Sequence, residues 1–182
     1  LFCKSSTSIL LSATSICGIV CTAEKREKNN VIDYLSYPVR IYPVGRLDKD
    51  SEGLLLMTND GAIVNGIMRA RNRHEKEYQV EVNKETTPEF LKKMASGVPI
   101  LDTVTRPCRI QKTGERSFTI ILTQGLNRQI RRMCEALGYR VTKLKRVRIM
   151  NIHLKDLKTG EYRPLTEKEL AELKKQIGEE KR

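Results

Sequence analysis

Three carboxylates lie within five residues of one another, just before a glycine and an apolar run. Asp48, Asp50 and Glu52 alternate with other residues, and Gly53 follows them. Alternating acids before a glycine are typical of a calcium loop, whose first, third and fifth residues supply oxygen ligands. The twelfth position of such a loop carries a bidentate glutamate, but here it is Asn59. The spacing therefore disfavours calcium.

A phosphoryl-transfer site is the second chemistry that this segment suggests. Asp48 would be its nucleophile and Asp50 its acid. Such a nucleophile normally follows a hydrophobic strand, whereas Gly45 and Arg46 stand shortly before Asp48. A solvated turn is the third alternative. Arg46 disfavours this alternative, because it offers the cationic partner that an ionised aspartate needs in a partly dry cleft.

Further cations lie between Leu126 and Met133. Arg131 borders the apolar face of the helix predicted there and can point toward a cleft. Arg128 and Arg132 are four residues apart, so they share an adjacent side that suits phosphate. Three solvated arginines are the simpler alternative. The helix is predicted by apolar residues at positions i, i+3, i+4 and i+7, namely Ile130, Met133, Cys134 and Leu137.

Short strands and isolated helices must position these residues. Strands clustered between helices, with hairpin-length connections, indicate an α+β fold with a mostly antiparallel sheet. Helices are predicted over 31–35, over 62–71 after a turn at 58–61, from Pro88 with Thr87 as cap to Gly97, over 127–137, and after Thr166, which forms a capping box with Glu169. Strands are predicted over 19–22, 41–44, 54–58, 78–82, 104–111, 117–123 and 140–150.

The strand predicted over 140–150 carries cations on both faces. Lys143 and Lys145 fall on one face, and Arg146 and Arg148 on the other. A strand with this pattern is expected near an edge of its sheet. We interpret these cations as contacts to a polyanion backbone, with solubility as the alternative.

The overall charge points to the same kind of partner. The 182 residues contain 34 Lys and Arg against 22 Asp and Glu, which gives a net charge of +12 and a pI near 9.6. Such an excess favours nucleic acid. No apolar run reaches the roughly 18 residues that a membrane span needs, so no membrane association is expected.

Cysteine and histidine usage predicts neither disulfides nor a metal site. The five cysteines contain no C-x-x-C pair, and only two histidines are present. Reduced thiols in a cytoplasmic protein are the simplest interpretation. The first twenty residues carry one charge and an apolar centre interrupted by Ser and Thr. A first strand or an altered N-terminus fits them better than a secretion signal.

Three separated motifs resemble the pseudouridine synthases, and most closely their RsuA-type branch. The likeness extends in order from about Gly18 to Leu170. It implies a central mixed, largely antiparallel sheet with helices around a catalytic cleft. The motifs are Gly45-Arg46-Leu47-Asp48 followed by Gly53-Leu54-Leu55, then Lys76-Glu77-Tyr78, then the run from Gln124 to Met133.

The resemblance also implies a catalytic domain over 18–182 with two sub-lobes, 18–75 and 76–182, after an atypical segment 1–17. Members of this branch usually begin with a small S4-type RNA-binding domain, and nothing in this sequence corresponds to it. We therefore expect a catalytic domain alone, with weakened affinity for RNA.

The resemblance assigns roles to individual residues. Asp48 would be the catalytic aspartate, and Arg131 the arginine that pairs with it. Tyr78 would stack on the target uracil, and Arg46 would fill the space that the flipped base leaves. No cofactor and no metal is implied. The residues expected to bind the substrate or other parts of the RNA are Arg46, Lys76, Asn127, Arg128, Gln129, Arg132, Lys145, Arg146 and Arg148.

The implied activity is the conversion of uridine to pseudouridine in RNA, by cleavage of C1′–N1, rotation of the base and rejoining through C5. Asp48 can attack C1′ or remove the C2′ proton, and both routes stay open. The expected substrate is large-subunit (23S) rRNA, with tRNA as a second candidate, and the expected enzyme is a cytoplasmic monomer. The alternatives are a non-catalytic rRNA-binding or ribosome-assembly protein on the same fold, and a metal-dependent phosphatase built on the acidic loop.

Overall fold

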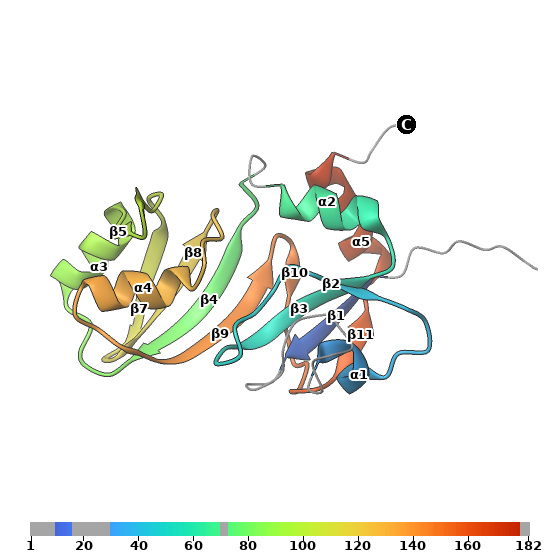
Figure 1. The fold of residues 1–182 in the computed structure, drawn as a ribbon, viewed down its shortest axis with the longest axis horizontal. Coiled ribbons are helices and arrows are strands. Elements are labelled where there is room, and N and C mark those ends of the chain that lie inside the picture. The colour runs from blue at the N-terminus through green and yellow to red at the C-terminus, as the bar shows by residue number, and fades with distance from the viewer. Residues whose placement is uncertain (1–9, 16–29, 70–72, 179–182) are drawn as a thin grey trace, which may run out of the picture.

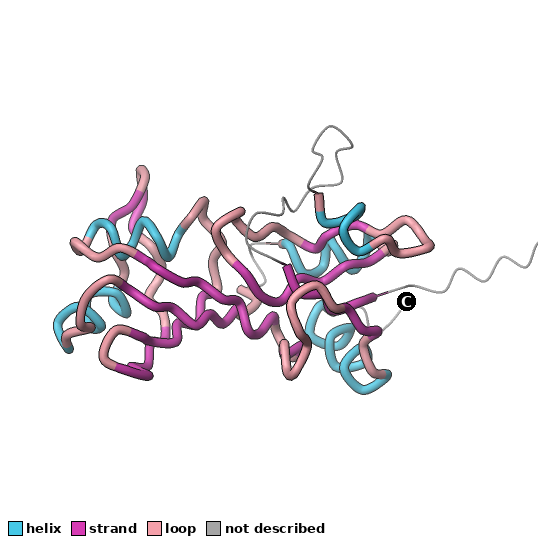
Figure 2. Tube along the Cα trace, turned by 90° about the horizontal axis from the view of Figure 1, so that it is seen from below, coloured by secondary structure: helices cyan, strands magenta, loops and turns pink. Residues whose placement is uncertain are grey.

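One twisted sheet runs through both halves of the computed structural model, as Figure 2 shows. The structure describes residues 10–15, 30–69 and 73–178. The strands in this part of the chain are β1 (Leu10–Ser15), β2 (Tyr42–Val44), β3 (Glu52–Thr58), β4 (Lys76–Val82), β5 (Pro99–Ile100), β6 (Thr103–Val104), β7 (Arg109–Gly114), β8 (Ser117–Leu122), β9 (Val141–Ile149), β10 (Ile152–His153) and β11 (Tyr162–Pro164).

The strand order within the described residues is β11-β1-β3-β9-β4-β8-β7, with β2 beside β3 and β10 beside β9. β5 and β6 form a separate hairpin. In the described sheet β3 pairs with β9 in parallel, and the other pairings are antiparallel. The predicted α+β fold with a mixed, largely antiparallel sheet is confirmed.

Helices cover the sheet in both halves (Figure 1). α3 and α4 lie over the half that contains β4, β7 and β8, and α2 and α5 belong to the other half. The predicted capping box of Thr166 and Glu169 is present at the start of α5. None of the helices that the structure describes is long and apolar enough to span a membrane. The helices are α1 (Val31–Leu35), α2 (Gly61–Met68), α3 (Pro88–Ser96), α4 (Gln129–Ala136) and α5 (Glu167–Ile177).

Of the predicted strands, one begins later than expected and another cannot be compared with the structure. The strand expected over 104–111 begins only at Arg109, since Val104 belongs to the β5–β6 hairpin. Pro107 stands between the two and has no backbone N–H to offer a ladder. The strand expected over 19–22 lies outside the described residues.

Three apolar clusters fill the two halves of the molecule. The cluster beneath α3 and α4 draws on residues from Val80 to Leu144. The clusters of the other half combine residues of β1 and of the segment from Val31 to Ile67 with residues from Ile149 to Leu173. The C-terminal segment therefore packs on the first half, which differs from the expected division into 18–75 and 76–182. The reason is that β9 starts in one half and ends in the other.

β9 lies at the centre of the sheet, so the prediction that it lies near an edge is wrong. It pairs with β3 on one side and β4 on the other. Two of the cations that suggested an edge have hydrogen-bond partners on neighbouring segments. Arg148 forms ion pairs with Glu75 and Glu77, and Arg146 donates a hydrogen bond to the carbonyl of Leu54. Such partners come from other strands, so alternation within one strand does not reveal them.

The close approach of β3 to β9 requires a glycine after the acidic loop. Gly53 has φ +112°, and a Cβ atom there would lie 2.7 Å from the backbone nitrogen of Arg146. Only glycine accepts both this backbone angle and this separation at low cost. The end of the acidic loop is thereby held against the central strand.

Candidate active site

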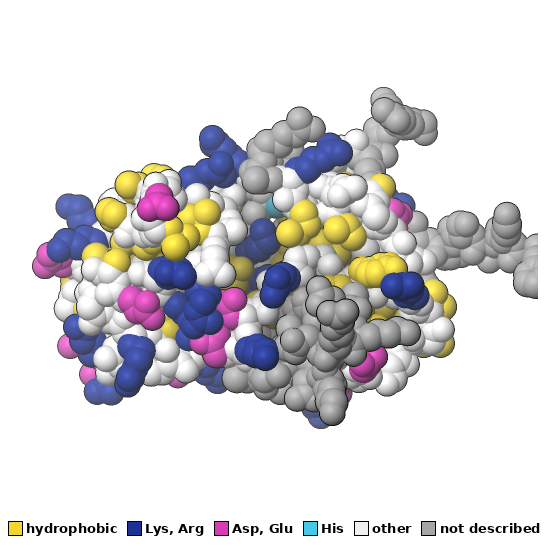
Figure 3. Space-filling view, in the orientation of Figure 1, with side chains coloured by type: hydrophobic (Ala, Val, Ile, Leu, Met, Phe, Trp, Pro, Cys, Tyr) yellow, Lys and Arg dark blue, Asp and Glu magenta, His cyan; other side chains and the backbone are white. Residues whose placement is uncertain are grey.

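A cleft of about 390 Å³ lies where the two halves meet. It is lined by residues 44–48 and Ser51 of the loop before β3, by the start of β4, by Leu122 and residues 124–130, and by residues of β9. Figure 3 shows Lys and Arg side chains gathered around the hollow between the halves. Eight of the twelve predicted site residues line this cleft, namely Arg46, Asp48, Lys76, Tyr78, Asn127, Arg128, Gln129 and Arg146.

Asp48 presents a half-buried carboxylate to the cleft from the loop between β2 and β3. Its side chain is 35% exposed, and the ion pair it makes among the described residues is with Arg128, whose Nη1 lies 3.9 Å from Oδ2. The loop turns sharply here because the N–H of Ser51 donates to the carbonyl of Asp48 at 2.9 Å. The catalytic candidate therefore keeps oxygens that no close ion pair occupies.

Asp50, two residues later, is held by two arginines of the opposite half. Arg128 forms a bidentate contact, with Nη1 3.0 Å from Oδ1 and Nη2 2.7 Å from Oδ2. Nε of Arg131 lies 3.3 Å from Oδ2 of Asp50, although its N–H is not aimed at that oxygen. The hydrogen bonds from Arg128 hold the pKa of Asp50 below its usual value, and the charge of Arg131 contributes as well.

Arg131 is almost fully buried and supports the acidic loop from behind the cleft. Its Nη2 donates to the backbone carbonyl of Asp50 at 2.6 Å and to Oγ of Ser51 at 3.3 Å. The predicted pairing of Arg131 with Asp48 is therefore corrected, because Asp50 is its carboxylate partner. The turn at 48–51 places Asp50 toward α4 and leaves Asp48 toward the cleft.

The N-terminus of α4 directs Arg128 across the cleft. Arg128 has φ +48°, and α4 begins one residue later than this bend. Arg132 instead folds back, with Nε 3.1 Å from the carbonyl oxygen of Asn127. Arg128 and Arg132 thus do not form the shared phosphate-binding side that their spacing suggests, because the left-handed residue breaks the helical geometry between them.

Tyr78, Arg146 and Lys76 form the part of the cleft wall that the sheet contributes. Tyr78 lies opposite Arg146 in the β4–β9 register, and Lys76 lies two residues before Tyr78. Arg146 is buried, with Nε 2.8 Å from the carbonyl oxygen of Leu54 and Nη1 3.4 Å from that of Arg46. Arg146 therefore ties the loop that carries Asp48 to the sheet.

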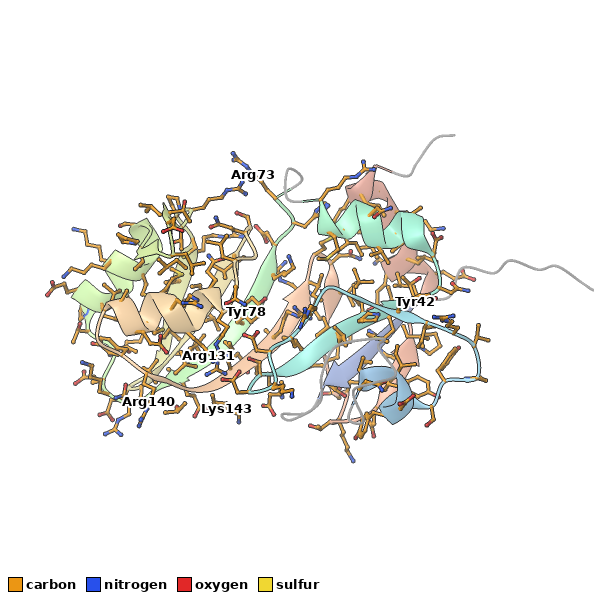
Figure 4. The ribbon with its side chains drawn as sticks, in the orientation of Figure 1. Tyr42, Arg73, Tyr78, Arg131, Arg140 and Lys143 are labelled. Carbon is orange, nitrogen blue, oxygen red and sulfur yellow. The ribbon has the colours of Figure 1, made fainter. Side chains whose placement is uncertain are left out.

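Four predicted site residues lie outside the cleft lining: Arg131, Arg132, Lys145 and Arg148. Figure 4 shows Arg131 and Tyr78 near the junction of the halves, on α4 and β4. Lys145 points to the opposite face of β9 from Arg146, as alternation along a strand requires. Arg148 is engaged by Glu75 and Glu77.

Comparison with known proteins identifies the family. A family model described as RNA pseudouridylate synthase matches residues 17–136. This chain belongs to the RNA pseudouridylate synthase family. It is 53% identical over 169 residues to the dual-specificity RNA pseudouridine synthase RluF of Salmonella typhi, covering 93% of this chain and 58% of that protein. The chain thus spans less than two thirds of the length of this relative.

Two further members of the family extend the comparison. The ribosomal large subunit pseudouridine synthase B of Bacillus subtilis is 35% identical over 86% of this chain and 68% of its own length. A crystal structure of a pseudouridylate synthase superposes with a TM-score of 0.86 at 27% identity, over 92% of this chain and 74% of that one. The fold expected of a pseudouridine synthase is thereby confirmed.

Asp50 is a residue beside this cleft that the predicted set omits. Its signal in the sequence is a second carboxylate two residues after Asp48, matched by two arginines, Arg128 and Arg131, three apart on one helix. The pattern alone does not determine which aspartate pairs with which arginine, because the pairing depends on the turn at residues 48–51.

Proposed function

We propose that this chain converts a uridine in RNA to pseudouridine, with large-subunit rRNA as its substrate and tRNA as a second one. The observation that carries the proposal is the carboxylate of Asp48, which faces a basic cleft that Tyr78 also lines and makes no close ion pair with any residue that the structure describes. Membership of the RNA pseudouridylate synthase family and the names of the relatives support it. We expect a monomer that acts where ribosomes are assembled, in the cytoplasm.

Asp48 supplies the chemistry at the sugar. Its carboxylate attacks C1′ or removes the C2′ proton, and either route releases the base from C1′. Arg128, whose Nη1 lies 3.9 Å from Oδ2 of Asp48, is too far away to bind both oxygens of this carboxylate. Asp50 and Arg131 act as positioning residues, since they fix the loop that presents Asp48.

Tyr78 and Arg46 handle the base. A stacked uridine hides C1′, so it must be extruded at a cost of a few kcal/mol. Stacking on an aromatic ring such as Tyr78 returns about 1–3 kcal/mol of this. Arg46, which also lines the cleft, would occupy the gap that the base leaves in the RNA stack. The remaining cations contact phosphates and position the substrate without selecting the base.

The test is pseudouridine formation in a large-subunit rRNA transcript, with EDTA present, by this chain and by Asp48→Asn. We expect pseudouridine at one site with the unchanged chain and none with Asp48→Asn, although both bind the RNA. Salt-sensitive RNA binding without product from the unchanged chain would contradict the proposal and favour the non-catalytic RNA-binding role. If the unchanged chain formed product only when EDTA was left out, the chemistry would instead be metal-dependent.

A further inference from the structure

Lys76 is a half-buried cation held between apolar neighbours. In the sheet it lies opposite Leu122 of β8 and Ile149 of β9, and both of these side chains are buried. Burial lowers the pKa of Lys76, and the charge of Arg146 lowers it further. Among the residues that the structure describes, no carboxylate forms an ion pair with Lys76.

The acids nearest to Lys76 in sequence are engaged elsewhere. Glu75 and Glu77 flank it, and both bind Arg148, at 3.0 Å and 2.8 Å. Glu77 lies opposite Arg148 in the β4–β9 register, on the other face of β4 from Lys76. The positions that could have neutralised Lys76 are therefore used for a different contact.

Arg146 adds a second uncompensated charge to the same wall of the cleft. It is 3% exposed, and its Nη2 is buried with no hydrogen-bond partner among the described residues. Its other nitrogens bind carbonyls rather than carboxylates. Burying cations is costly unless negative charge compensates them. Since Asp48 pairs with Arg128, the compensating charge at Lys76 and Arg146 is expected from a ligand.

We propose that Lys76 is a further catalytic residue, whose ammonium group stabilises the negative charge on uracil while the base is detached from the sugar. This role rests on the proposed function. Arg146 acts as a positioning residue, a fixed charge beside Lys76 that the ligand does not need to touch. The location suits this role, because Lys76 is two residues from Tyr78 on the same face of β4, within reach of a base stacked on that ring.

The charge follows from the electron balance of the reaction. When C1′–N1 breaks, the bonding pair stays with uracil and spreads over N1, O2 and O4. The carboxylate of Asp48 bonds to C1′, or it takes the C2′ proton while a C1′–C2′ double bond forms. After the base turns, C5 bonds to C1′, and the carboxylate leaves or the proton returns to C2′. C5 loses one proton and N1 gains one, so the product is an isomer.

The experiment compares single-turnover rates at saturating rRNA transcript, and Kd for that transcript, for Lys76→Met, Lys76→Arg and the unchanged chain. Met suits a position between Leu122 and Ile149, so the fold is expected to survive. We expect Lys76→Met to lower the rate by about 100-fold or more, as loss of a donor to a developing anion does, with little change in Kd. Lys76→Arg keeps the charge and is expected to recover part of the rate. Lys92→Met, on the exposed side of α3, is the matched control and should behave as the unchanged chain.

Phosphate binding by Lys76 is the competing outcome. In that case Lys76→Met weakens RNA binding and leaves the saturated rate unchanged. Its effect then also disappears on a transcript with a neutral methylphosphonate beside the target uridine. This result overturns the proposal, and so does a variant with unchanged rate and unchanged Kd. Failure of the unchanged chain to form pseudouridine is a separate result, which contradicts the proposed function itself.

Discussion

At the scale of single residues, Asp48 and Asp50 differ in what their side chains contact. Asp48 faces the cleft with one distant cation, whereas Asp50 is bound by Arg128 and Arg131. The same residue type thus serves two purposes within one turn. Substitutions at the two positions should therefore separate chemistry from the positioning of the loop.

Asp50→Asn removes the charge that holds Arg128 and Arg131 while it keeps the size of the side chain. We expect the single-turnover rate to fall on the order of 10- to 100-fold, because a displaced loop misplaces the carboxylate of Asp48. The unfolding free energy should fall by about 1 kcal/mol, since the Asp50 side chain is partly exposed and Arg131 keeps its bond to the carbonyl. Urea titration and the RNA assay measure the two effects. Asp48→Asn is the comparison: it should lose turnover with a stability change within about 0.5 kcal/mol.

The aromatic ring and the hydroxyl group of Tyr78 can be tested separately. Tyr78→Phe keeps the ring, so RNA affinity should be retained, and any large loss of rate would implicate the hydroxyl group. Tyr78→Leu removes the ring and should weaken binding of the extruded uridine by roughly 1–3 kcal/mol. Equal affinity of the Phe and Leu variants for the RNA would rule out stacking on this side chain.

At the scale of elements, helix ends could be predicted and the lateral order of strands could not. The caps at Thr87 and Thr166 follow from neighbouring residues, and both are found in the structure. The central position of β9 depends on β3 and β4, which are far away in the sequence. Eight of the twelve predicted site residues line the cleft, whereas the pairing of Arg131 with Asp50 depends on a turn that the motif does not encode.

The contact of β3 with β9 predicts a specific sensitivity at Gly53. Gly53→Ala places a Cβ against the backbone of Arg146 at φ +112°, so we expect a loss of about 2 kcal/mol or more in unfolding free energy. Gly61→Ala is the matched control, since a Cβ there meets nothing within 4 Å. Its stability should be unchanged or slightly raised, as helix propensity favours alanine. Urea denaturation of both variants measures this difference. Equal midpoints for Gly53→Ala and Gly61→Ala would show that a Cβ at position 53 causes no strain.

The contact between Arg163 and Glu169 at the start of α5 should make the unfolding free energy depend on pH in the acidic range. Hydrogen bonds from Arg163 hold the pKa of Glu169 far below its usual value of 4.5. A carboxyl group whose pKa is lower in the folded state than in the unfolded state stabilises the fold at pH values above its unfolded-state pKa. This stabilisation is lost as the pH falls from the unfolded-state pKa toward the folded-state pKa. Glu169→Gln should therefore cost about 1.5–3 kcal/mol at neutral pH, and the difference should narrow toward about pH 3. Glu167→Gln, on the same helix, should show no such convergence in urea titrations at the two pH values.

At the scale of the whole molecule, charge and shape act together. The chain carries a net charge of +12, and Arg46, Lys76, Arg128 and Arg146 are among the residues that line the cleft between its halves. Under the proposed function, the cations that line the cleft contact the target nucleotide, and the other cations contribute to affinity for RNA in general.

RNA binding should depend steeply on salt. Each phosphate contact contributes a slope of about 0.7–0.9 to the plot of log Kd against log salt concentration, so about six contacts would weaken binding roughly 1,000-fold between about 50 and 200 mM salt. Filter binding or fluorescence anisotropy with the rRNA transcript measures this slope. Asp48→Asn should give the same slope as the unchanged chain, since it alters no phosphate contact. A flat salt response would mean that the positive charge serves solubility alone.

The place of β9 also has a consequence for the order in which the protein is made. The part of the described sheet that precedes Val141 consists of β1, β2 and β3 on one side and β4, β7 and β8 on the other, with no ladder between the two groups. Asp48 belongs to the first group and Tyr78 to the second, so a nascent chain that ends before β9 lacks the strand that joins these two parts of the sheet. Non-local pairings of this kind form late in folding. An enzyme proposed to act on ribosomal RNA would thus become competent only after β9 has been translated and has inserted between β3 and β4.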